Sequence, residues 1–232
     1  MSSVNFEIVK CEDRIFFYDG EQYVLFDTGF IRTPNGKNSI SASGKIGPFS
    51  VKAMPQGFIS SFVNLRIDGK SISAVLNPMD GFNCKLEGNT LTVSDEPMEI
   101  DGHEYFFEFI DRNLPLVEGS INGQKCRLFF DSGARMTMFG ERSLAAEGPV
   151  RTYREWMALK QQYADLEVFE MHLTFPNGFD YCGEGALVDD PCYKAATSMM
   201  NIRAMLGIDI FTHYDLIIIA NGTKRGIALF KK

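Results

Sequence analysis

Short apolar runs separated by polar turns follow one another along almost the whole chain. The clearest are FEIVK (6–10), RIFFYD (14–19), QYVLFD (22–27), YDLIIIA (214–220) and GIALF (226–230). Runs of this length, bounded by turn residues, are typical of β-strands. The pattern therefore predicts an all-β fold.

Two dipeptides between such runs predict tight hairpins. Asp68-Gly69 and Asn122-Gly123 both carry the residue types that two-residue hairpin turns require. We expect a β-hairpin at each position.

Two segments have helical rather than alternating spacing. In 152–167 the larger side chains recur at mostly helical intervals, and Thr152 with Glu155 matches a capping box. This predicts a helix over 152–167, with Trp156 and Met157 packed in its core. A shorter helix is expected over 192–202.

The chain also repeats itself. VLFDTGFIRT (24–33) aligns with LFFDSGARMT (128–137): each has an apolar run, an aspartate, a hydroxyl residue and a glycine. A threonine follows in both copies, Thr33 and Thr137. Two copies of one strand-rich unit indicate an internal pseudo-two-fold axis.

The downstream parts of the two copies align as well. Segment 72–93 lies over 202–230, and the second copy is longer because it includes the helix predicted at 152–167. We expect two lobes, 1–97 and 98–232, with the polar stretch 95–112 as the crossing between them. Symmetry would then bring Asp27 and Asp131 face to face.

Two facing carboxyl groups have a specific chemistry. They cannot both ionise cheaply at close range, so one keeps a proton while the other is charged. Such a pair can activate a water molecule and polarise a carbonyl group without a metal. Gly29 and Gly133 allow sharp loops, while Thr28 and Ser132 offer hydroxyls that can bond to the opposite loop.

These motifs resemble the aspartic peptidase superfamily, of the retropepsin and pepsin kind. The second half matches the family pattern at 131–134, Thr137 and Met205-Leu206-Gly207, and the first half at 27–29, Thr33 and Val75-Leu76. The resemblance covers nearly the whole chain and implies a bilobal acid-protease barrel fold with one inserted helix. It also implies an aspartic endopeptidase that acts on extended peptides and needs no cofactor or metal. The implied catalytic residues are Asp27 and Asp131, supported by Thr28, Gly29, Ser132, Gly133 and Ala134.

Two positions depart from the family pattern. Phe30 replaces a small residue beside the first loop, and Asn77 replaces the downstream glycine. Asn tolerates positive φ better than other non-glycine residues, which would preserve the loop. Two alternatives stay open: a catalytically silent peptide-binding or scaffold module, and a homodimeric protease that uses only Asp131 of each chain.

The resemblance further implies a mobile hairpin over the cleft, which we place within 43–66. The helix predicted at 152–167 occupies the corresponding place in the second lobe. Because Phe30 and Ala134 are apolar, they offer few hydrogen bonds to a carboxylate, and we expect a raised upper pKa of the pair. Activity is then expected at mildly acidic to neutral pH.

The charge and the lengths of the apolar runs limit the kinds of partner that we expect. The net charge of −7 argues against nucleic acid, and no apolar run is long enough to span a bilayer. The start of the chain lacks a signal-peptide pattern, so the five cysteines are expected as reduced thiols in a cytoplasmic protein. A monomer is expected.

Other titratable residues suggest no second site. The histidines His103, His172 and His213 show no metal-ligand spacing. Asp80 and Asp209, which follow the downstream anchors, are expected to cap turns or helices.

Overall fold

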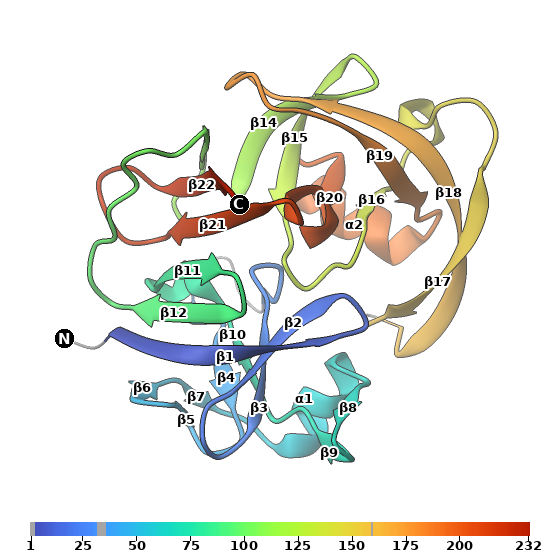
Figure 1. Cartoon of the computed structure of the whole chain (residues 1–232). Coiled ribbons are helices and arrows are strands. Elements are labelled where there is room, and N and C mark those ends of the chain that lie inside the picture. The colour runs from blue at the N-terminus through green and yellow to red at the C-terminus, as the bar shows by residue number, and fades with distance from the viewer. Residues whose placement is uncertain (1–2, 32–35, 159) are drawn as a thin grey trace.

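The computed structural model describes residues 3–31, 36–158 and 160–232, and strands are its main secondary structure (Figure 1). Thr33 and Leu159 lie outside the described residues. The first half contains these elements: β1 Ser3–Cys11, β2 Arg14–Tyr18, β3 Tyr23–Phe26, β4 Ile40–Ser41, β5 Lys45–Ile46, β6 Phe49–Ser50, β7 Lys52–Ala53, α1 Gln56–Phe62, β8 Arg66–Ile67, β9 Lys70–Ser71, β10 Ala74–Leu76, η1 Pro78–Asp80, β11 Asn83–Glu87 and β12 Thr90–Ser94. The all-β prediction is confirmed.

The second half is built mainly from longer strands. Its elements are β13 Tyr105–Glu108, β14 Leu116–Ile121, β15 Gln124–Phe130, β16 Thr137–Phe139, η2 Arg142–Leu144, β17 Arg151–Met157, β18 Gln162–Thr174, β19 Asp180–Leu187, α2 Pro191–Met199, β20 Ala204–Leu206, η3 Ile208–Phe211, β21 Tyr214–Ile219 and β22 Gly226–Lys231. No helix in the described part of the chain is both long and apolar enough to cross a membrane.

One large sheet contains strands from both halves. Its order is β13-β22-β21-β11-β12-β1-β2-β3-β10-β4-β7. The terminal hairpins of the two halves, β11–β12 and β21–β22, join through β11 and β21, where Lys85 pairs with Ile217. In addition, β1 pairs with β12 and β13 pairs with β22. The six strands from β13 to β1 are therefore arranged symmetrically about the β21–β11 pairing.

The second half also forms a closed barrel. Strands β14, β15, β20, β16, β19 and β18 pair in that order, and a further pairing of β14 with β18 closes the ring. Strand β17 pairs with β18 and extends away from the barrel as one arm of a long hairpin (Figure 1).

The repeat found in the sequence reappears as matched strand pairing. β3 runs parallel to β10, with Phe26 opposite Leu76, and β15 runs parallel to β20, with Phe130 opposite Leu206. Both pairings have three residues in equivalent register. The alignment of Leu76 with Leu206 is therefore confirmed.

Both predicted tight hairpins are present. Asp68 and Gly69 have φ of 51° and 75°, and Asn122 and Gly123 have φ of 48° and 78°. Two successive positive φ values are typical of turns whose twist matches that of paired strands. The shorter predicted helix is also present, as α2.

The predicted helix over 152–167 is wrong. The segment forms the distal part of the β17–β18 hairpin, in which Trp156 lies opposite Tyr163 with ring centroids 5.2 Å apart. The turn includes Gln161, whose φ is 51°. Trp156 and Tyr163 are seven residues apart, a spacing that places two side chains on one face of a helix. In a hairpin the same two residues can pair across the strands, so the spacing alone does not distinguish the two structures.

Candidate active site

The two repeated aspartates sit at the ends of equivalent strands. Asp27 follows β3 and Asp131 follows β15. The backbone N–H of Asp27 donates to the carbonyl of Leu76 at 3.0 Å, and that of Asp131 donates to Leu206 at 2.9 Å. The parallel pairing of each strand with β10 or β20 thus fixes where its aspartate emerges.

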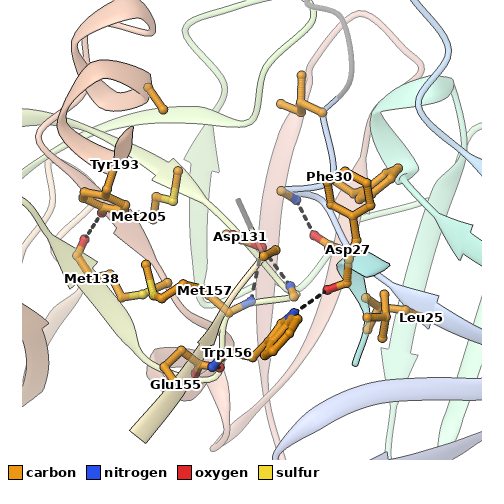
Figure 2. A pocket seen from close by; sticks show the side chains of 18 of the residues that line it. Leu25, Asp27, Phe30, Asp131, Met138, Glu155, Trp156, Met157, Tyr193 and Met205 are labelled. Carbon is orange, nitrogen blue, oxygen red and sulfur yellow. Dashed lines mark hydrogen bonds between the residues drawn. The ribbon is translucent and has the colours of Figure 1, made fainter. Parts of the chain in front are cut away.

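The structure brings these two carboxyl groups together, and their side chains form a hydrogen bond. Both lie at the centre of the cavity in Figure 2. A Cβ atom at Gly29 would overlap the carboxyl group of Asp131, and one at Gly133 would overlap that of Asp27. Each loop therefore needs glycine to make room for the acid of the other loop.

Thr28 and Ser132 lock the two loops to each other. The Thr28 hydroxyl donates to the carbonyl of Phe130 at 2.8 Å and accepts from the backbone N–H of Ser132 at 2.9 Å. Ser132 mirrors this: its hydroxyl donates to Phe26 at 3.2 Å and accepts from the N–H of Thr28 at 3.0 Å. Both hydroxyl residues are fully buried, so these four bonds are shielded from water.

The environment of the pair raises the pKa of both acids. Burial is the largest cause for Asp27, followed by the charge of Asp131, and its pKa lies well above the usual range. Burial also raises the pKa of Asp131, but the hydrogen bond from Asp27 and those from Gly133 and Ala134 oppose it, as does the charge of Arg14. Burial therefore favours one proton shared by the pair over a negative charge on both acids.

Backbone N–H groups at equivalent positions donate to both carboxylates. Asp131 accepts from the N–H groups of Gly133 at 2.9 Å and Ala134 at 3.2 Å, and Asp27 accepts from Gly29 at 2.7 Å. The N–H of Phe30 also bonds to Asp27 and lowers its pKa. Phe30 and Ala134 therefore supply hydrogen bonds through their backbones, although their side chains are apolar.

Asn77 takes the glycine position of the first half without positive φ. Its φ is −104°, and that of Gly207 is −75°, so backbone freedom does not explain either residue. A Cβ at Gly207 would overlap the backbone of Met136. Asn77 instead uses its side chain, which donates to the carbonyls of Phe30 at 2.9 Å and Thr28 at 3.3 Å.

The hydroxyl equivalent to Thr137 is Ser39. Thr137 accepts from the N–H of Gly207 at 3.2 Å, and Ser39 accepts from the N–H of Asn77 at 3.0 Å. The sequence alignment had assigned this place to Thr33, which lies outside the described residues. The loop from Asp27 to Ser39 is longer than the loop from Asp131 to Thr137, so an ungapped alignment does not place Ser39 opposite Thr137.

A mostly apolar cavity of about 660 Å³ opens above the aspartates. The first half contributes the rings of three phenylalanines, and the second half contributes methionines together with the ring of Trp156. Its main apolar lining consists of Phe30, Phe58, Phe62, Met138, Trp156, Met157, Met200 and Met205. Both acids line the cavity, so they stay partly accessible to solvent although protein surrounds them.

The β17–β18 hairpin reaches across this cavity. The indole N–H of Trp156 donates to the carbonyl of Phe62, at the end of α1, at 3.2 Å (Figure 2). Lys160, in the turn of the hairpin, forms an ion pair with Asp190, the N-cap of α2. Trp156 and Met157 therefore line the cavity and do not pack in a helix core.

The expected hairpin within 43–66 is replaced by shorter elements. This segment contains the small β5–β6 hairpin and α1, and only residues from α1 onward line the cavity. The hairpin that reaches across the two acids belongs to the second half, where a helix had been expected.

Sequence reasoning missed a buried ionic network beneath the hairpin. Glu155 is 4% exposed and bonds to Arg14 at 2.7 Å, Arg135 at 3.2 Å and the hydroxyl of Tyr153 at 2.8 Å. Burial alone would raise the pKa of Glu155, but Arg14, Tyr153 and Arg135 together hold it below the usual range. Arg14 also donates to the carbonyl of Gly133 at 2.9 Å.

This network connects the hairpin to the second aspartate loop through a residue of the first half. No local motif marks Glu155, because its charged partners, Arg14 and Arg135, are far away in the sequence. In the sequence, Glu155 stands out only through the capping-box match with Thr152, which predicted a helix where the structure has a strand.

Asp80 and Asp209 lie outside the pair of facing acids. Asp80, in η1, accepts from the backbone N–H groups of Asn38 and Ser39, so it connects η1 to the segment before β4 and does not cap a turn or helix as expected. Asp209 lies in η3, and burial raises its pKa to about 7 although it accepts bonds from backbone N–H groups, including that of Thr137. One of its carboxyl oxygens has no hydrogen-bond partner among the described residues.

No protein-family model matches the chain, and a search of curated proteins likewise found no match.

Proposed function

We propose that this protein is an aspartic endopeptidase whose two catalytic acids, Asp27 and Asp131, come from one chain. The observation that carries the proposal is the hydrogen-bonded pair of carboxyl groups on two equivalent loops in an apolar cavity. Such a pair combines an acid and a base at one point.

The two acids take different roles in the proposed reaction. Asp131, ionised and supported by backbone N–H groups, removes a proton from a water molecule as that water attacks the peptide carbonyl carbon. Asp27 donates its proton to the carbonyl oxygen, which gives a tetrahedral diol. Return of a proton from Asp131 to the amide nitrogen then allows the C–N bond to break. The proton from the collapsing diol returns to Asp27.

Burial sets the pH range of this cycle. Because the pKa of Asp27 lies well above its usual value, the singly protonated pair persists beyond the acidic range. Activity is expected at mildly acidic to neutral pH, and a rate optimum near pH 2 would contradict the assignment.

The cavity favours extended peptides with apolar side chains. Its lining is largely aromatic on one side and methionine-rich on the other, so substrate affinity would come mainly from apolar contact. The β17–β18 hairpin would cover the bound chain, and entry of a peptide would require the Trp156–Phe62 bond to open.

The two alternatives make different demands on the same residues. A homodimer that uses only Asp131 would leave Asp27 without a role, whereas in this structure Asp27 bonds directly to Asp131. A silent peptide-binding module would keep the cavity but lack turnover. Phe30 motivates this second alternative because its ring lines the cavity beside Asp27.

Cleavage of an unbiased peptide library tests the proposal. We expect activity in the wild type and a loss of at least about 10³-fold in kcat/KM for both Asp27→Asn and Asp131→Asn, since either change removes one partner of a proton-sharing pair. Asp101→Asn, in an exposed turn, is the matched control and should keep full activity.

Two outcomes would replace the proposal. Tight binding of a statine-type inhibitor with no cleavage of any peptide would favour the silent module. Full activity of Asp27→Asn in a chain that elutes as a dimer would favour the homodimeric enzyme.

A further inference from the structure

Three side chains with different donor atoms meet on the outer face of the barrel, on strands β18 and β19. His172 and Cys182 lie directly opposite each other in the antiparallel pairing, and Asp180 is two residues from Cys182 on the same face. All three are exposed, and their ligand atoms lie within 4.8 Å of one another. None of them contributes to the cavity above the catalytic pair.

These donors suit a zinc-like ion. Imidazole nitrogen, thiolate sulfur and carboxylate oxygen are the usual protein ligands of Zn²⁺, and three of them with one water complete a tetrahedral shell. In such a shell the ligand atoms are roughly 3 to 4 Å apart. His172 Nε2 and Asp180 Oδ1 are already 2.9 Å apart, so only small side-chain rotations separate this arrangement from a coordination shell.

The backbone beneath the three side chains is firmly held. Strands β18 and β19 stay paired from Glu167–Leu187 to Thr174–Asp180. The backbone of His172 is further fixed by Asn122, which accepts from its N–H at 2.9 Å and donates to its carbonyl at 2.8 Å. Ligands on such a rigid scaffold lose little freedom when a metal binds.

The surrounding charge favours a cation. Glu170 and Glu184 form the next pair on the same face, beside the pair of His172 and Cys182. Arg151 is the basic partner of Glu184, at 2.6 Å. Together with Asp180, these glutamates make the local potential negative.

We infer that His172, Asp180 and Cys182 form a binding site for a divalent transition metal of the zinc class. The metal clamps β18 to β19 at the end of the hairpin strands remote from Trp156 and stabilises the barrel. It takes no part in the proposed peptide hydrolysis.

Cobalt substitution tests the site directly. The reduced, chelator-treated protein is titrated with Co²⁺, and we expect one equivalent to produce a near-ultraviolet thiolate-to-cobalt band together with tetrahedral visible bands. Cys182→Ser should abolish the thiolate band, and His172→Ala should weaken binding at least about tenfold. Cys192→Ser and His213→Ala change the same residue types elsewhere and should behave as the wild type.

Thermal unfolding gives a second readout. Zn²⁺ at about 100 times its dissociation constant should raise the Tm of the wild type and both control variants by roughly 5–10 °C. Cys182→Ser should melt at the wild-type temperature without metal and show no shift with it. Absence of stoichiometric Co²⁺ binding, or a thiolate band that survives in Cys182→Ser, would overturn the inference.

Discussion

At the scale of single residues, burial is the main cause of the raised pKa of three aspartates. Asp27, Asp131 and Asp209 all have raised pKa values, and burial is the first cause in each case. Asp209 differs because no other acid among the described residues contributes to its raised pKa. It offers a test of burial that is independent of catalysis.

Asp209→Asn should reduce the pH dependence of stability. With a folded pKa of about 7 against 3.8, the native state holds a proton that the unfolded state has lost. The stabilising contribution is complete below about pH 4 and is lost as the pH rises through 7, amounting to about 4 kcal/mol. Urea unfolding at pH 4 and pH 8 measures this contribution. The free energy of unfolding of the variant should exceed that of the wild type only at pH 8.

An equal increase in the free energy of unfolding at both pH values would show that the titration of Asp209 does not cause the effect. Asp80→Asn is an informative comparison, because the carboxyl group of Asp80 accepts hydrogen bonds from the backbone N–H groups of Asn38 and Ser39. Its replacement should destabilise the protein at pH 8 and should not stabilise it.

The residues of the facing loops could be predicted from sequence because duplication repeats them. Asp27 and Asp131 each carry their own hydroxyl residue and glycine, so one copy identifies the other. The compensation by Asn77 could not be predicted, since it depends on where its amide meets the carbonyls of Phe30 and Thr28. Metal ligands such as His172 and Cys182 become neighbours only through strand pairing.

At the scale of elements, the β17–β18 hairpin is the main difference between expectation and structure. Its turn, 158–161, contains no Gly, Pro, Asn or Asp, so the sequence gives no turn signal there. In the sequence, Glu155 also matches the acidic position of a helix capping box. Only the structure shows that it is a buried acid paired with Arg14 and Arg135. Local pattern therefore favoured a helix where long-range pairing forms two strands.

Glu155→Gln should show how firmly the hairpin is held. The change leaves Arg14 and Arg135 buried beside a neutral amide, and loss of one partner from a buried ionic group is costly. We expect a loss of about 3 kcal/mol in the free energy of unfolding. If the protein is a peptidase, KM should rise as well, because the hairpin covers the substrate.

Glu12→Gln provides the matched control. Glu12 contacts the same two arginines, at 3.5 and 3.6 Å, but its side chain is 43% exposed, so its removal should change stability by less than about 1 kcal/mol. Equal effects of the two substitutions in urea unfolding would show that burial of Glu155 does not matter.

At the scale of the whole molecule, the two halves depend on each other. They share the large sheet through β11 and β21, and the Thr28 and Ser132 hydroxyls cross between the loops. Only this assembly brings two carboxyl groups, distant in sequence, into one hydrogen bond. A chain reduced to either half would keep an aspartate loop without the partner that alters its pKa.

Carboxyl titration by NMR on ¹³C-labelled protein shows whether Asp27 and Asp131 share one proton. We expect both carboxyl resonances to respond to the same two ionisation steps, with the upper step well above the usual aspartate range. Asp131→Asn should reduce the two steps to one. Independent titration of Asp27 and Asp131 near their ordinary pKa of about 4 would contradict the account.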